Sequence, residues 1–229
     1  MKDATFRRNA AAIGLAATAV LSAVSVLLQP DFGPDPAARL TALDAAGLRG
    51  QISAVTFVVA QLPAIAGLLG LAHLIRSASP RLSNAGGTLS MIGIFGHTVF
   101  GGMTMAYLGM AADVENRAIH GALINRLESG PVMIFAALGL LGFVLGVAVL
   151  AVGLWRTRVV ARWVPALLGA WLVVEFVGTG LSAYAAPLSA TMFVVACFAL
   201  ARCLWQTPAT NWSTPHPVAA VPEPSTAQH

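Results

Sequence analysis

Six long apolar stretches, separated by short polar connections, dominate this chain. An α-helix rises 1.5 Å per residue, so about 20 apolar residues cross the roughly 30 Å hydrocarbon layer of a bilayer. Unpaired backbone amides cost several kcal/mol each in lipid, so only helices and closed barrels span a membrane. The stretches lack the two-residue alternation that is typical of barrel strands. The sequence therefore predicts an all-α fold, a six-transmembrane-helix bundle.

The membrane domain is expected to occupy residues 1–205. Its helices are predicted at residues 9–29, 50–75, 84–112, 130–155, 163–183 and 185–205. Polar connections are expected at residues 30–49 and 113–129. Pro63 is expected to kink the second helix, because proline removes a backbone hydrogen bond. Residues 206–229 hold several prolines among small polar residues, which predicts a disordered Pro-rich cytoplasmic tail.

The first apolar stretch follows Lys2, Arg7 and Arg8, an arrangement that a signal peptide also shows. The stretch is longer than the usual apolar core of a signal peptide. No A-x-A-like cleavage site stands directly before Gln29. We therefore interpret the stretch as an uncleaved first membrane helix.

The distribution of charge predicts how the bundle is oriented. Only 10% of the residues are charged, against about 25% in a soluble domain. If the chain crosses the membrane six times, nine basic residues share one side: Lys2, Arg7, Arg8, Arg76, Arg81, Arg156, Arg158, Arg162 and Arg202. The other four are Arg39, Arg49, Arg117 and Arg126. The positive-inside rule then places both termini in the cytoplasm of a cell whose plasma membrane holds the protein.

The same distribution limits the partners. The net charge of +4 comes from residues at helix ends, and no basic patch interleaved with aromatic residues is present. We therefore exclude nucleic acid as a partner. The expected partners are the lipid bilayer and, within it, a second copy of the chain or another membrane protein.

Rows of small residues predict which helix faces are buried, because membrane helices associate through residues that permit close approach. The third helix has such a row in Gly86, Ser90, Gly93, His97, Gly101 and Thr104. The first has Gly14, Thr18, Ser22 and Ser25, and the fourth has Gly139, Gly142, Gly146 and Gly153. Trp155, Trp163 and Trp205 lie at predicted cytoplasmic ends, as interfacial anchors do.

Three polar residues interrupt the apolar pattern at mid-membrane depth, and they form the candidate site. Glu175 and His97 each lie about 12 residues, or roughly 18 Å, inside the bilayer. An ionised carboxylate at that depth costs at least about 2.5 kcal/mol, so Glu175 must be protonated, paired or hydrated. The first hypothesis is a Glu175–His97 pair that relays protons or binds a cation. The alternative is a neutral Glu175 bonded to a serine, a threonine or the backbone.

Gln61 reaches the same region, two residues before Pro63. A kink there would open a polar cavity, but an interhelical hydrogen bond is the favoured interpretation of a single buried glutamine.

The remaining histidines and the two cysteines yield no predicted cofactor, metal or catalytic site. His73 lies near a helix end, about 9 residues away in depth from His97, which argues against one haem between them. His120 lies near Asp113 in sequence, but no metal-binding motif surrounds it. Cys197 and Cys203 are six residues apart on different helix faces, which argues against a local disulfide. The chain also lacks a G-x-S-x-G motif and a P-loop, so we expect it not to be an enzyme.

The segment of residues 146–178, GVAVLAVGLWRTRVVARWVPALLGAWLVVEFVG, ends one helix, forms a basic turn and starts the next helix at Trp163, Val164 and Pro165. This layout resembles small bacterial six-helix membrane proteins classed as domains of unknown function. The resemblance extends over residues 9–205. It implies the six-helix architecture and carries no catalytic residues.

Together these patterns favour a non-enzymatic integral membrane protein that acts as a structural or partner-binding subunit. One alternative is a small-solute or proton-coupled carrier that uses Glu175 and His97. Another is a haem- or quinone-binding membrane protein.

Overall fold

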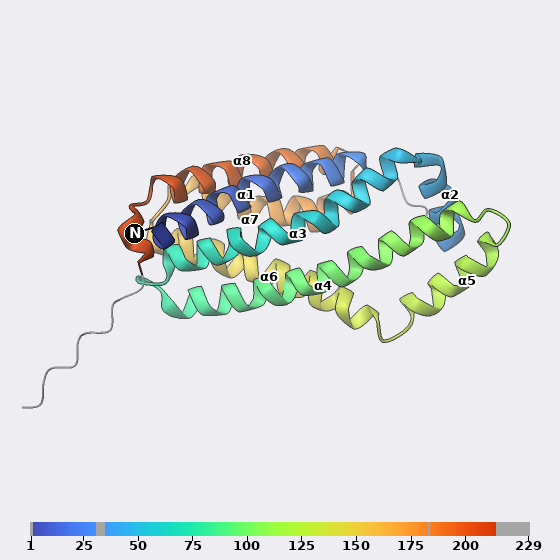
Figure 1. Ribbon diagram of the computed structural model, residues 1–229, viewed down its shortest axis with the longest axis horizontal. Helices are drawn as coiled ribbons and strands as arrows, with labels where there is room; N and C mark the ends of the chain where they lie inside the picture. The colour runs from blue at the N-terminus through green and yellow to red at the C-terminus, as the bar shows by residue number, and fades with distance from the viewer. Residues whose placement is uncertain (1, 31–34, 183, 214–229) are drawn as a thin grey trace, which may run out of the picture.

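The computed structural model describes residues 2–30, 35–182 and 184–213, and these residues form an elongated helical bundle (Figure 1). Within them the α-helices are α1 (Lys2–Leu28), α2 (Pro36–Ala46), α3 (Leu48–Ile75), α4 (Pro80–Ala112), α5 (Arg117–Glu128), α6 (Met133–Thr157), α7 (Trp163–Phe176) and α8 (Ala185–Gln206). Short 3₁₀ helices, η1 (Gly178–Gly180) and η2 (Ala209–Trp212), follow α7 and α8.

The predicted fold class is confirmed. Six helices are long and apolar enough to cross a membrane: α1, α3, α4, α6, α7 together with η1, and α8. The chain is a multi-pass membrane protein. Most predicted boundaries differ from the observed ones by a few residues. The first helix begins at Lys2 rather than at residue 9, and α3 continues as one helix through Pro63.

The fifth predicted helix, residues 163–183, is wrong at its end. The α-helix stops at Phe176, and a 3₁₀ turn takes its place. Gly178 and Gly180 have low helix propensity, which disfavours continuation of the α-helix. With Thr179 between them, they form the 3₁₀ helix η1. The hydroxyl of Thr179 donates to the backbone carbonyl of Glu175. The α-helix therefore ends one residue after the candidate site residue Glu175.

The six membrane helices form a closed ring. Each packs against the next in the order α1, α3, α4, α6, α7 and α8, and α8 packs against α1. The main hydrophobic core runs through this ring, with Leu15, Ile75, Leu150, Leu154 and Leu200 among its buried side chains. A bundle closed in this way has an interior that all six helices can line.

Glycines hold α4 and α6 together, as the small-residue rows predict. A Cβ added to Gly96 would lie 2.2 Å from the backbone nitrogen of Gly139, and one added to Gly93 would lie 2.3 Å from that of Phe143. Further along the two helices, Gly146 meets Ser90. The antiparallel helices therefore touch backbone to backbone, a contact that only residues without a side chain permit.

The two connections predicted as polar loops are corrected by the structure, because each contains a helix. The carboxylate of Asp35 accepts hydrogen bonds from the backbone amides of Ala37 and Ala38, and Pro36 occupies the first turn of α2. Gly47 ends α2 with a φ of 51°, in the left-handed region that favours glycine. These signals are present in the sequence, but the polar composition conceals them.

The helices α2 and α5 pack beside the end of α4 to form a cap at one end of the bundle (Figure 1). With 33 residues, α4 is about 50 Å long and extends past the roughly 30 Å hydrocarbon layer. A second small core joins the three helices through Leu40, Leu43, Tyr107, Ala111 and Ile124. We call this end of the molecule the capped end.

At the opposite end the chain folds back after α8. Trp212 in η2 is buried and stacks on His73, with 4.3 Å between the ring centroids. The prediction of a disordered tail is therefore wrong for residues 206–213. The rest of that prediction, residues 214–229, lies outside the described residues.

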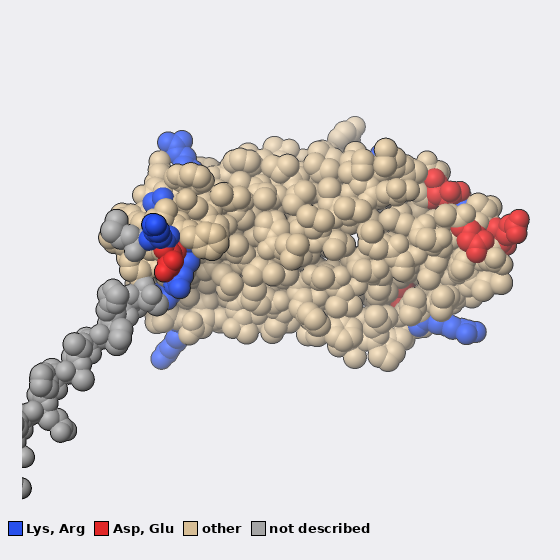
Figure 2. Space-filling view, in the orientation of Figure 1, with Lys and Arg blue, Asp and Glu red and all other residues tan. Residues whose placement is uncertain are grey.

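Charged residues mark the two ends. Figure 2 shows Lys and Arg gathered at the end that holds the N-terminus, and Asp and Glu concentrated at the capped end. The face between them carries almost no charge in this view. We call the end that holds the N-terminus the basic end. The separation matches the alternation of basic and acidic connections in the sequence.

Candidate functional site

A cavity of about 190 Å³, which we call the inner cavity, lies inside the helix ring. All six membrane helices contribute side chains to its wall. The three predicted site residues line it together: Gln61 from α3, His97 from α4 and Glu175 from α7. Among the described lining residues, Glu175 and His97 are the titratable ones, and none is Lys or Arg.

Glu175 is held by the neighbouring helix. The hydroxyl of Ser189, in the first turns of α8, donates a hydrogen bond to Oε2 of Glu175. Ser189 itself is fully buried, so this contact fixes the carboxylate against α8. Of the two hypotheses from the sequence, the alternative predicted that Glu175 bonds to a serine, a threonine or the backbone, and Ser189 is such a partner. The sequence alone does not identify Ser189.

His97 lies among aromatic rings. Its ring centroid is 5.0 Å from that of Phe143 on α6 and 5.8 Å from that of Phe57 on α3. Gly139 makes room for it, because a Cβ there would lie 3.0 Å from Cδ2 of His97. The small-residue contact between α4 and α6 therefore also positions the histidine at the cavity wall.

Gln61 makes a different contact from the one predicted. Its Nε2 donates to the backbone carbonyl of Phe57, 2.9 Å away and one turn earlier in the same helix. The expected interhelical bond is therefore replaced by an intrahelical one. The bond keeps this buried side chain beside the cavity that both Gln61 and Phe57 line.

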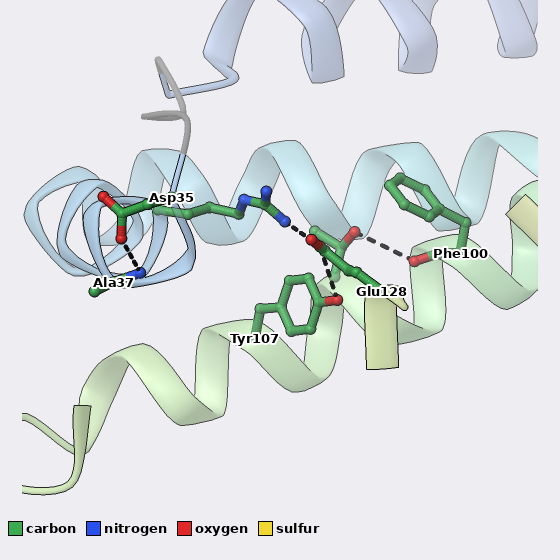
Figure 3. Close-up of polar contacts among 7 residues, drawn as sticks. Asp35, Ala37, Phe100, Tyr107 and Glu128 are labelled. Atoms are coloured by element: carbon green, nitrogen blue, oxygen red, sulfur yellow. Dashed lines mark hydrogen bonds and ion pairs between the residues drawn. The ribbon is translucent and has the colours of Figure 1, made fainter. Parts of the chain in front are cut away.

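A larger cavity of about 450 Å³, the outer cavity, lies under the cap. An ion pair between Arg39 of α2 and Glu128 of α5 forms part of its wall. The hydroxyl of Tyr107 on α4 is 3.3 Å from the same carboxylate oxygen, and Figure 3 shows this ring pointing toward Glu128. These three residues join the three helices of the cap and were not predicted as a site.

The two cavities adjoin. Ser25, Gln29 and Phe57 line both of them. At this boundary Ser25 and Ser53 bond reciprocally, each hydroxyl donating to the other residue's backbone carbonyl at 2.9 and 2.8 Å. A polar contact between α1 and α3 thus lies where the two cavities share lining residues.

Of the described histidines, His73 and His120 do not line the inner cavity. His73 lines a separate pocket at the basic end, where its Nε2 donates to the carbonyl of Asn211 at 3.0 Å. The structure therefore does not bring His73 and His97 together, as the haem hypothesis would require.

His120 pairs with Asp113 at the capped end, 3.0 Å apart. This hydrogen bond, followed by those from Asn116, lowers the pKa of the Asp113 carboxyl. Across the described residues, no group of three or more His, Cys, Asp or Glu side chains is placed to hold a metal ion. Cys197 and Cys203 are both free thiols, which confirms the expectation that they form no local disulfide.

Fold and site together define a multi-pass membrane protein with a cavity inside its helix ring that Glu175, His97 and Gln61 line. Comparison with protein-family models, curated proteins and solved structures finds no match. The resemblance to small bacterial six-helix membrane proteins therefore stays a prediction.

Proposed function

We propose that this protein is a carrier that binds a small solute in the inner cavity and couples its passage to protons. One observation carries the proposal: Glu175, His97 and Gln61 lie on three different helices and line one cavity inside the ring. Ionisable residues within membrane helices are costly and commonly mark the path of an ion or a substrate. A purely structural subunit, which the sequence alone favours, has no need of such a cavity.

The geometry suggests how the residues act. Glu175 holds a proton or a solute group, with Ser189 supplying a hydrogen bond to the carboxylate. His97 lines the same cavity and offers a second place for the proton. Only binding and proton transfer are required, so the proposed role involves no enzymatic reaction.

The end of α7 beside Glu175 also supports the proposal. The α-helix of α7 stops one residue after Glu175 and continues as η1. Substrate sites of transporters are typically built where membrane helices are interrupted. The adjoining outer cavity, capped by α2 and α5, gives the solute a route from the capped end.

Reconstitution into liposomes tests the proposal. Vesicles loaded with a pH-sensitive dye receive pulses of small cationic, neutral and anionic solutes, and internal pH is followed. We expect at least one class of solute to drive proton movement, and Glu175→Gln to reduce its initial rate by more than tenfold. Glu115→Gln, which removes an exposed carboxylate at the capped end, serves as the matched control and should leave the rate unchanged.

Absence of solute-driven proton movement across all three classes would contradict the carrier and favour the structural or partner-binding subunit. An equal rate in Glu175→Gln would remove Glu175 from the mechanism.

A further inference from the structure

We infer that the inner cavity selects a small organic cation, such as a quaternary ammonium or a protonated amine. The inference rests on the proposed function, because it names the solute class of the same site. It follows from the charge, the aromatic content and the size of the cavity.

Charge comes first. Glu175 is the acidic side chain in the described wall of the inner cavity, and no Lys or Arg side chain accompanies it there. An ionised carboxylate in such surroundings attracts a cation and repels an anion. A monovalent cation would neutralise the site and remove the cost of an unpaired charge in the membrane.

The aromatic wall favours an organic cation over a hydrated inorganic one. Phe143 lies 6.2 Å from Trp171 between ring centroids, and Trp171 lies 4.4 Å from Phe193 and 6.3 Å from Phe176. With Phe57 next to His97, these side chains form a connected set in the wall of the cavity that Glu175 also lines. Aromatic faces attract cations within about 6 Å of the ring centroid, and quaternary ammonium groups are bound in this way.

Size limits the ligand further. Pockets for drug-sized molecules measure about 300–1,000 Å³. The inner cavity, at about 190 Å³, is smaller, whereas the outer cavity, at about 450 Å³, falls within that range. A headgroup of a few carbon atoms around one nitrogen fits the inner cavity, and the outer cavity can hold any longer substituent.

Equilibrium binding to the purified protein in nanodiscs tests the inference. The probes are choline, its uncharged carbon isostere 3,3-dimethylbutan-1-ol, and the anion 3,3-dimethylbutanoate. These three share a bulky branched head and differ in charge. We expect choline to bind at least tenfold more tightly than either of the others. Equal or tighter binding of the isostere or the anion would overturn the inference, as would displacement of choline by equimolar K⁺.

Two variants separate the contribution of the Glu175 carboxylate to choline binding from that of the aromatic side chains. Glu175→Gln should weaken choline binding by tenfold or more and leave binding of the isostere unchanged. Phe193→Leu keeps the carboxylate and should weaken choline binding by several fold. Glu115→Gln is the control and should bind as the unmodified protein does. If Glu175→Gln does not fold, the comparison of the three probes on the unmodified protein still tests whether the cavity selects a cation.

The two proposals fail in different ways. Choline binding without proton movement would contradict the carrier and leave the ligand class standing. If an anion or a neutral solute drives proton movement that depends on Glu175, and choline does not bind, the carrier stands and the proposed ligand class is contradicted.

Discussion

At the scale of single residues, the absence of a side chain matters as much as its presence. Gly96 and Gly139 allow α4 and α6 to touch along their backbones, and Gly139 also leaves room for His97. The candidate site is therefore positioned by glycines that carry no chemistry. Gly102 on the same helix has no such role, since a Cβ added there would meet nothing within 4 Å.

This contrast leads to a paired prediction. Gly96→Ala places a methyl group 2.2 Å from the backbone of Gly139, so the two helices must separate. We expect the free energy of unfolding to fall by about 1–3 kcal/mol, as in overpacked cores. Gly102→Ala should be neutral or stabilise the protein by about 0.5–1 kcal/mol, because alanine is the better helix former. Unfolding titrations in detergent measure both, and equal losses would contradict the packing argument.

Which polar residues lie within the membrane helices can be predicted from the sequence, but the contacts of these residues cannot. The depth of Glu175 and His97 follows from counting residues along two helices. Their shared cavity depends on the order of helices around the ring, which no pattern in one sequence reveals. Ser189 and the ion pair of Arg39 with Glu128 were missed for the same reason. Arg39 and Glu128 lie 89 residues apart, and Ser189 lies 14 residues from Glu175 in the next helix. In both cases many other pairings would satisfy the same residue types.

At the scale of elements, the sequence of the cap contains helix start and stop signals that its mixed composition makes hard to recognise. The membrane helices are recognisable because each is a long apolar run. The helices α2 and α5 have only 11 and 12 residues and mixed composition, so hydropathy does not reveal them. The sequence Asp35-Pro36, with Gly47 after the helix, does mark the start and end of α2.

The contribution of the N-capping residue Asp35 to the stability of α2 should be measurable. Asp35→Ala removes the hydrogen bonds to the amides of Ala37 and Ala38, and such caps contribute about 1 kcal/mol. We expect hydrogen exchange in α2 to become about fivefold faster, with little change in α6. Asp35→Asn keeps a capping oxygen and should restore protection. Slow exchange in Asp35→Ala would show that packing against α4 alone holds this helix.

A second prediction for the cap concerns pH. The hydrogen bond from His120, and those from Asn116, lower the pKa of Asp113 in the folded protein. A carboxyl with a lowered folded pKa stabilises the fold above its unfolded pKa, near 3.9, and this contribution is lost as pH falls through the folded pKa. Asp113→Asn should therefore lower the thermal midpoint at pH 7 and have no effect well below pH 4. The neighbouring Glu115→Gln should match the unmodified protein at both pH values. A loss that persists at low pH would rule out the carboxylate as its cause.

At the scale of the whole molecule, the ring and the charges together suggest an orientation. An even number of spans brings Lys2 and the end of α8 to the same end of the bundle, where most Lys and Arg side chains gather (Figure 2). On the positive-inside rule, we predict that this basic end lies in the cytoplasm and the cap outside. In this predicted orientation the outer cavity faces the cell exterior, and the proposed carrier would take its solute from that side.

Single cysteines report this orientation directly. Cys197 and Cys203 are first replaced by alanine, and then Ser77→Cys at the basic end or Glu115→Cys at the capped end is introduced, both at exposed positions. A membrane-impermeant maleimide is added to intact cells. We expect it to label the Glu115→Cys protein and to label the Ser77→Cys protein at least tenfold less until the membrane is permeabilised. The opposite pattern would place the cap in the cytoplasm, and the solute would then bind from that side.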